Sequence, residues 1–124
     1  MINKNIVILG ASNKPQRYSN KAQVKLAKHG YEVFPVSRDV EEINGVMSVT
    51  SLLDIEVPID TVTVYLRPEI LTTIMDELIE LSPRRVIFNP GTESGILADQ
   101  LVEADIEITE ACTLVLLSTN QFED

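Results

Sequence analysis

The sequence predicts an α/β protein built on one open parallel sheet with helices on both faces. Short aliphatic runs at residues 6–9, 61–66 and 85–88 alternate with segments whose apolar residues recur at helical spacing. Such runs are typical of strands that are buried on both faces of a parallel sheet. Strands that alternate with helices in this way form right-handed βαβ crossovers. We therefore expect ligands to bind beyond the carboxyl ends of the strands, where the strand order reverses.

Length and composition favour one domain over residues 1–124. A chain of 124 residues buries roughly two-thirds of its unfolded surface. Its 44% hydrophobic and 23% charged residues are ordinary for a soluble protein, and no apolar run approaches the ~20 residues that span a bilayer. The apolar run before Gly10 is too short for a secretory signal, so we expect a cytoplasmic protein. Cys112 is the only cysteine, which excludes an internal disulfide and is consistent with a reducing compartment.

The first strand, residues 6–9, breaks at Gly10 into a polar loop that opens a helix. Ser19 or Asn20 is expected to cap that helix, and Gly30 marks its end. His29, at the same end, can meet unpaired carbonyl groups of the last turn. We expect Pro35 and the polar residues 37–39 to stop the second strand, which begins at Tyr31. The inward face of the helix is expected to be Ala22, Leu26 and Ala27.

The middle of the chain contains one irregular stretch and one clear βα unit. In residues 40–58 we expect a turn at 43–46 and a short helical segment at 51–55, capped by Ser51. Residues 61–66 are rich in β-branched side chains and predict the third main strand. The helix that follows, from Pro68 to Ser82, is expected to pack on the sheet through Ile70, Leu71, Ile74, Leu78 and Leu81.

The last third of the chain repeats the strand, turn and helix. Residues 85–88 predict a buried strand, and 89–91 a second glycine-bearing turn. A last strand is expected at 106–109, then a short apolar segment at 114–117 and a frayed polar tail at 121–124. The helix between these strands is expected to bury Ile96, Leu97, Leu101 and Val102.

Charge is distributed unevenly along this acidic protein. The net charge is −9, which opposes binding to nucleic acid or to an anionic membrane. No acidic residue precedes Glu32, whereas that segment carries six basic residues: Lys4, Lys14, Arg17, Lys21, Lys25 and Lys28. The last three are typical of a solvated helix face. A local basic region on an acidic protein suits a small polyanion better than a polymer.

The loop from Gly10 to Ser19 is a candidate phosphate site. Unpaired N–H groups and the positive end of the helix dipole favour a phosphate at a helix N-terminus. The three-glycine dinucleotide fingerprint is only partly present, because Gly10 is the one glycine of the loop. Where a domain that binds NAD places an acidic residue after its second strand, this chain has Ser37 and Arg38, which suit a ribose phosphate. These residues leave coenzyme A and NADP as candidate ligands.

Five segments of the chain resemble the small single-domain CoA-binding proteins, which are similar to the CoA-binding domain of the succinyl-CoA synthetase α subunit. The segments are residues 10–19, 29–36, 51–54, 67–69 and 89–91, and the most specific part is Arg17-Tyr18-Ser19. The resemblance implies a Rossmann-like fold that holds coenzyme A at the strand ends. The family tends to continue Asn-Pro after the second strand, where this chain has Ser37-Arg38.

The resemblance also implies which residues contact the ligand. Ser12, Lys14, Arg17 and Ser19 would contact phosphates, two corners at 36–38 and 66–68 would flank the nucleotide, and residues 89–91 would face the pantetheine arm. Tyr18 is either a ligand contact or a core residue with a hydrogen-bonded hydroxyl. The full set of expected nucleotide-binding residues is Gly10, Ala11, Ser12, Lys14, Arg17, Tyr18, Ser19, Val36, Ser37, Arg38, Leu66, Arg67, Pro68, Asn89, Pro90 and Gly91.

Three functions remain open from the sequence. A stand-alone module that binds coenzyme A or an acyl-CoA is favoured, because no catalytic triad, histidine–carboxylate pair or cysteine-rich metal motif is recognisable. The alternatives are an NADP-dependent enzyme or reductase fragment, and a regulatory subunit that docks through its acidic part. Cys112 is either an inert small side chain or a thiol that forms a mixed disulfide with coenzyme A.

Overall fold

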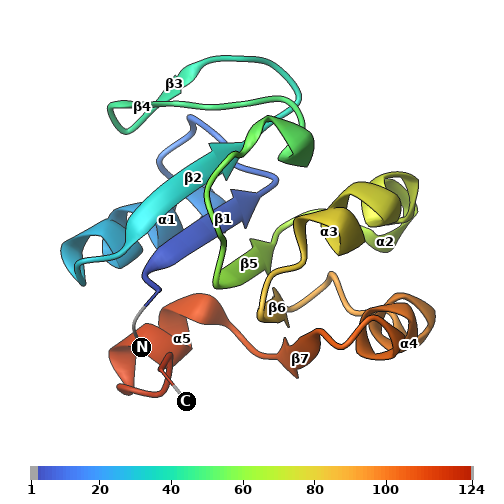
Figure 1. Cartoon of the computed structure of the whole chain (residues 1–124). Coiled ribbons are helices and arrows are strands. Elements are labelled where there is room, and N and C mark those ends of the chain that lie inside the picture. Colours follow the sequence, from blue (N-terminus) through green and yellow to red (C-terminus); the bar gives the residue numbers. More distant parts are fainter. Residues whose placement is uncertain (1–2, 124) are drawn as a thin grey trace.

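A computed structural model describes residues 3–123 and confirms the predicted α/β fold, a parallel sheet of five strands (Figure 1). The strand order is β2-β1-β5-β6-β7, and every neighbouring pair is parallel. The chain runs outward from β1 to β2 and then returns to the other side of β1, so the order reverses between β1 and β5. The strands are β1 (Asn5–Leu9), β2 (Glu32–Val36), β5 (Thr61–Val64), β6 (Arg85–Phe88) and β7 (Glu107–Glu110).

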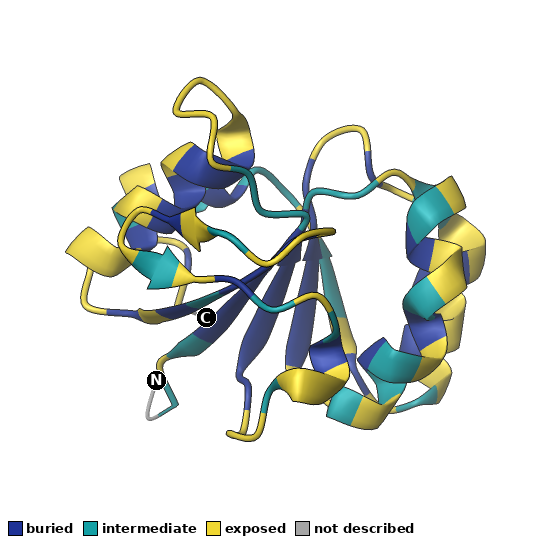
Figure 2. Cartoon of the chain, turned by 90° about the horizontal axis from the view of Figure 1, so that it is seen from above, coloured by how far each residue is buried: buried dark blue, intermediate teal, exposed yellow. Residues whose placement is uncertain are grey.

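Helices cover both faces of the sheet (Figure 1). α1 (Tyr18–Lys28) and α5 (Thr113–Ser118) lie on one face, and α2 (Pro68–Leu71), α3 (Met75–Leu81) and α4 (Gly95–Glu103) on the other. Figure 2 shows the strands buried between helices whose outer surfaces are exposed. No helix within the described residues is long and apolar enough to cross a membrane.

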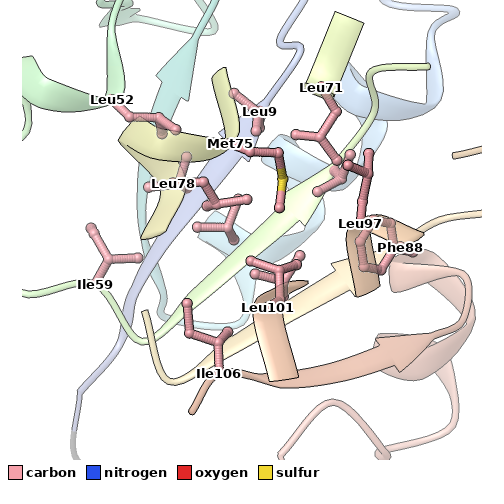
Figure 3. Close-up of a cluster of buried hydrophobic side chains, with 14 of the residues drawn as sticks. Leu9, Leu52, Ile59, Leu71, Met75, Leu78, Phe88, Leu97, Leu101 and Ile106 are labelled. Carbon is pink, nitrogen blue, oxygen red and sulfur yellow. The ribbon is translucent and has the colours of Figure 1, made fainter. Parts of the chain in front are cut away.

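Side chains of β1 alternate between two hydrophobic clusters. Ile6 and Ile8 pack with α1 and α5, whereas Val7 and Leu9 pack with α3 and α4, as the two-residue period of a strand requires. Figure 3 shows the cluster on the side of α3 and α4, in which Met75, Leu78 and Leu101 pack against side chains of the strands. The apolar runs therefore serve as strands buried on both faces, as predicted.

Several element boundaries differ from the sequence predictions. α1 begins at Tyr18, with Arg17 rather than Ser19 or Asn20 at the N-cap. Ala27 is exposed, whereas His29 lies at the C-terminal end of α1 as predicted. The helix predicted after Pro68 is interrupted by a 3₁₀ turn, η2 (Thr72–Ile74), and β7 ends one residue later than predicted. The apolar segment at 114–117 is part of α5.

The prediction that Pro35 stops the second strand is wrong. Pro35 lies inside β2, opposite Ile8 of β1. Because β2 is an edge strand, a missing N–H group is tolerated there, and the Pro35 carbonyl accepts a hydrogen bond from Val49 N at 3.1 Å. The stretch after β2 holds the predicted turn inside a small hairpin, β3 (Glu42–Ile43) and β4 (Val46–Met47), and then the 3₁₀ helix η1 (Leu52–Asp54), whose first turn Ser51 caps as predicted.

Two further burial predictions are wrong. Ile96 and Val102 are 73% and 54% exposed, because the inward face of α4 is formed by Leu97, Ala98 and Leu101. The tail is not frayed at Phe122, which is buried against Tyr31, and the Tyr31 hydroxyl donates to Glu123 at 2.9 Å. The last residue of the predicted tail, Asp124, lies outside the described residues.

The amino edge of the sheet contains an ion pair between the buried carboxylate of Asp60 and the exposed Arg84, and this pair makes stability depend on pH. Burial would raise the pKa of Asp60, but hydrogen bonds from Arg84 and Thr61 outweigh it and hold the pKa below its ordinary value of 3.8. Asp60 therefore stabilises the fold above the pKa of the unfolded chain, and this contribution is lost as the pH falls through the folded-state pKa. We expect Asp60→Asn to lower the free energy of unfolding by about 2 kcal/mol at neutral pH.

Urea denaturation at pH 7 and at pH 3 tests this expectation. The difference between wild type and Asp60→Asn should shrink at the lower pH, because at pH 3 the Asp60 carboxylate of the unfolded chain is largely protonated, whereas its pKa in the folded protein is lower. Asp99→Asn, at an exposed position of α4, is the control and should change stability by less than about 0.5 kcal/mol. A difference that stays constant with pH would contradict the assignment.

Candidate functional site

The candidate site lies at the carboxyl edge of the sheet, where the strand order reverses between β1 and β5. A cavity of about 200 Å³ opens there, with aliphatic walls and one cationic side chain, that of Arg38. This is the edge at which open α/β sheets bind ligands. The cavity is lined by Leu9, Gly10, Val36, Ser37, Arg38, Thr50, Leu66, Ile70 and Ile74.

Gly10 brings the end of β1 into close contact with the end of β5. Its φ of +94° lies in the left-handed region that favours glycine. A Cβ atom at this position would lie 3.0 Å from the carbonyl carbon of Tyr65 and 3.0 Å from Leu66 Cδ2. Only glycine permits both the turn and this close approach, which shapes one wall of the cavity.

The donors available to a phosphate come from the first turn of α1, not from the glycine turn itself. The N–H groups of Gly10 and Ala11 both donate to the Val36 carbonyl, at 3.1 and 2.9 Å. At the N-terminus of α1, Lys21 N is the first amide that reaches an acceptor inside the helix, the carbonyl of Arg17. The amides of residues 18–20 are therefore the helix-terminal donors of this loop.

Asn20 fixes the loop against α1. Its side-chain Nδ2 donates to the Ser12 carbonyl at 2.8 Å, and the Ser12 hydroxyl accepts from Lys14 N at 3.2 Å. Lys14 and Arg17 are exposed, and neither forms an ion pair within residues 3–123. The alternative to a phosphate contact, a pair between Arg17 and a surface carboxylate, is thus not seen among the described residues.

Tyr18 and Ser19, the other residues of the motif, differ in exposure. Tyr18 is 69% exposed, so the prediction of a core tyrosine is wrong. Its ring lies beside Lys21, with Nζ 5.5 Å from the ring centroid. Ser19 is buried in the first turn of α1. Tyr18 is thus accessible to a ligand.

The corner after β2 combines a buried serine with an exposed arginine. The Ser37 hydroxyl donates to the Asp39 carbonyl and lies 3.0 Å from the Ser48 hydroxyl, so it fixes the hairpin that follows β2. Arg38 is exposed and lines the cavity. Of this pair, Arg38 is the side chain that can reach an anion.

Asn89 directly follows β6, and both polar atoms of its side chain form hydrogen bonds with other residues of the fold. Nδ2 donates to Thr63 Oγ1 at 2.7 Å and to the Val64 carbonyl at 2.9 Å, and Oδ1 accepts from Thr113 N at 2.9 Å. It thereby joins the ends of β5 and β6 to the start of α5. Pro90 and Gly91 are exposed at the same edge.

Tyr65 and Cys112 also lie at this edge of the sheet. Burial raises the pKa of Tyr65 to about 12, against the opposing effect of hydrogen bonds with Thr63 and Thr113. Its hydroxyl is therefore protonated at physiological pH. Cys112 is half-buried at the N-cap of α5, directly after β7. Within residues 3–123, no cluster of histidine, cysteine or carboxylate side chains could hold a metal ion.

The cavity gathers only part of the predicted residue set. Gly10, Val36, Ser37, Arg38 and Leu66 line it, whereas the loop residues 11–19, the helix start 67–68 and the turn 89–91 do not. Sequence reasoning missed four lining residues: Leu9, Thr50, Ile70 and Ile74. The helical spacing of the two isoleucines is visible in the sequence, but it indicates packing on the sheet and not a second role in a cavity wall.

Comparison with known proteins relates the chain to one family. The family model described as "CoA binding domain" matches residues 4–118. The uncharacterized protein YneT of Bacillus subtilis (strain 168) is 38% identical over 77 residues, which are 62% of this chain and 57% of YneT. The match therefore spans less than two thirds of that relative.

Solved structures share the fold over almost the whole chain. A crystal structure of an uncharacterized protein has a TM-score of 0.92 and 39% identity, covering 98% of this chain and all (100%) of the other. The dinucleotide-forming acetyl-coenzyme A synthetase 1 of Ca. Korarchaeum cryptofilum, in complex with phosphate and ADP, has a TM-score of 0.72. At 14% identity, covering 85% of this chain and 25% of the synthetase, it shares the fold alone.

Proposed function

The chain belongs to the CoA binding domain family, and on that premise we propose that it binds coenzyme A or an acyl-CoA at the carboxyl edge of the sheet. The observation that supports this most strongly is the cavity between the ends of β1 and β5. Its aliphatic walls suit the adenine base, and Arg38 at its rim suits the phosphate on the ribose. The protein acts as a ligand-binding module without chemistry of its own.

The phosphates lie over the N-terminus of α1 in this proposal. Ser12, Lys14, Arg17 and Ser19 contact them, together with the amides of the first helical turn. The remaining predicted residues line the path of the ligand: Gly10, Ala11 and Tyr18 at the loop, Val36 and Ser37 at one corner, Leu66, Arg67 and Pro68 at the other. Pro90, Gly91 and the backbone of Asn89 border the pantetheine arm.

Isothermal titration of the purified protein tests the function directly. Coenzyme A and acetyl-CoA should bind saturably, and NADPH should bind much more weakly. Absence of binding at millimolar coenzyme A would overturn the proposal. Binding of NADPH but not of coenzyme A would instead support an NADP-dependent enzyme that uses the same phosphate site.

Arg17→Ala should weaken coenzyme A binding by about 1.5 to 3 kcal/mol, or roughly 10- to 150-fold, because it removes a charged hydrogen-bond donor. Folding should barely change, since the side chain is exposed and forms no ion pair in the described part of the chain. Lys28→Ala, at the other end of α1, is the matched control. Equal affinities of the two variants, measured by titration, would exclude a phosphate contact for Arg17.

Arg38→Ala should weaken coenzyme A about tenfold or more but leave the affinity for dephospho-CoA unchanged. The two ligands differ only in the ribose phosphate that we assign to Arg38. Arg38→Lys should restore part of the affinity, because it keeps the charge but not the bidentate geometry. Equal losses for both ligands would mean that Arg38 contacts another part of the nucleotide.

A further inference from the structure

The outer face of α1 forms one wall of a second, larger hollow. An open groove of about 530 Å³ lies between this helix and the tip of the β3–β4 hairpin at Asn44. We call it the α1 groove, and its helical wall includes Lys21, Val24, Lys28 and His29. It is separate from the cavity at the carboxyl edge of the sheet, with which it shares no lining residue.

Lys21 and Lys28 of the α1 groove have no ion-pair partner in the part of the chain that the structure describes. The protein has 19 acidic residues and a net charge of −9, and α1 contains no acidic side chain. Nevertheless, the ion pairs of residues 3–123 involve Lys4 and Arg84, and none involves Lys21 or Lys28. Lys25 differs, because its Nζ donates to the Leu114 carbonyl and to Ser118 of α5. The groove thus keeps two exposed positive charges on an otherwise acidic protein.

Apolar surface lies between these charges. Val24 is 36% exposed and stands one turn after Lys21 and one turn before Lys28, so the three side chains share a helix face. Tyr18, 69% exposed, extends the same face toward the phosphate loop. A partner that matches this face would place an apolar side chain on Val24 and acidic groups on both sides of it.

Among anions, an acidic polypeptide suits this face best. Nucleic acids and anionic membranes present extended negative surfaces, which the net charge of −9 repels. A short acidic segment interacts mainly with charges within about 8 Å at physiological salt, so the local lysines dominate. We propose that the α1 groove is a docking surface for an acidic segment of a partner protein. Pro15 and Asn20 line its near end, so the docked segment lies beside the phosphate loop.

A labelled peptide tests the docking surface. Fluorescence anisotropy would follow a fluorescein-labelled peptide in which one leucine is flanked by short runs of glutamate. It should bind saturably, with affinity that falls as salt rises, and replacement of its leucine by serine should weaken it severalfold. Lys21→Gln/Lys28→Gln should weaken binding about tenfold or more, which corresponds to the loss of about 1.4 kcal/mol.

The control changes the charge of the protein by the same amount elsewhere. Thr72→Glu/Gln100→Glu, at exposed positions of η2 and α4, also lowers the net charge from −9 to −11 and should bind the peptide almost as wild type does.

Equal losses of peptide affinity in both double variants, or no binding by the wild type, would overturn the proposal. Preferential binding of phosphatidylserine vesicles or of double-stranded DNA, lost in Lys21→Gln/Lys28→Gln, would overturn it in favour of those partners. Coenzyme A affinity should be the same in all variants.

Discussion

Gly10→Ala should lower the free energy of unfolding by about 2 to 5 kcal/mol. Two physical effects contribute. An L-residue at a φ of +94° costs about 1 to 2 kcal/mol, and forcing a methyl group against packed neighbours costs a further 1 to 3 kcal/mol. The new Cβ would lie 3.0 Å from the Tyr65 carbonyl carbon, a backbone atom at the end of β5 that cannot rotate away.

Two other glycines separate these effects. Gly45, at the hairpin turn, has a φ of +83°, but no atom lies within 4 Å of the place that a Cβ would take, so Gly45→Ala should show only the conformational cost. Gly95, at the start of α4, has neither a positive φ nor a close neighbour, so Gly95→Ala should be neutral or slightly stabilising. Urea denaturation should therefore show the largest loss of unfolding free energy for Gly10→Ala, a smaller loss for Gly45→Ala and the smallest for Gly95→Ala. Equal losses at Gly10 and Gly45 would show that crowding at the strand end is unimportant.

Gly10→Ala should also weaken coenzyme A binding in the folded protein. Gly10 lines the cavity, and relief of the contact with Leu66 and Tyr65 must displace either the loop or the end of β5. Titration at a temperature where the variant remains folded measures this effect. Unchanged affinity would mean that the ligand does not use the cavity between β1 and β5.

Local chemistry explains which parts of the fold the sequence predicts well. The β-branched and aliphatic runs form buried strands, and Gly10, Gly30 and Gly91 adopt positive φ at the turns. The sequence predictions fail at positions where contacts between elements distant in the sequence determine which side chains are buried and where a strand ends. Ile96 and Val102 are as hydrophobic as Leu97 and Leu101, and only the docking of α4 on the sheet selects which pair is buried. Pro35 is misleading in the sequence because its edge position is a property of the sheet order.

In the candidate site, too, some residues could be predicted from local chemistry and others depend on tertiary contacts. The loop after Gly10 and the corner at Arg38 are visible from residue types alone, because glycine turns and basic side chains mark phosphate sites. Leu9, Thr50, Ile70 and Ile74 line the cavity because the ends of β1 and β2 meet the segment before η1 and the helices α2 and η2 there. That meeting follows from the topology of the sheet. Asn89 illustrates the opposite case, since its motif position suggests ligand contact while its side chain is bonded to residues that lie 24 to 26 positions away.

Asn89→Ala is expected to lower the free energy of unfolding by about 3 kcal/mol or more. The change removes three buried hydrogen bonds, each worth about 1 kcal/mol, and leaves Thr113 N and the Val64 carbonyl without this partner in the interior. Asn13→Ala, which removes one exposed hydrogen bond to Glu41, is the control and should cost less than about 1 kcal/mol. Chemical denaturation monitored by circular dichroism measures both losses.

A double-mutant cycle then assigns the loss to the network rather than to volume. Thr63 accepts from Asn89 Nδ2, and its hydroxyl also lies 2.8 Å from that of Thr113. Thr63→Val and Asn89→Ala should therefore couple by about 0.5 kcal/mol or more, because they share one hydrogen-bond network. Additive losses would contradict the network.

Asn89→Asp keeps the oxygen that accepts from Thr113 N but loses the two N–H donors to Thr63 and Val64. As the pH rises, the new side chain ionises and its carboxylate faces the Val64 carbonyl. The stability of this variant should therefore fall further with rising pH.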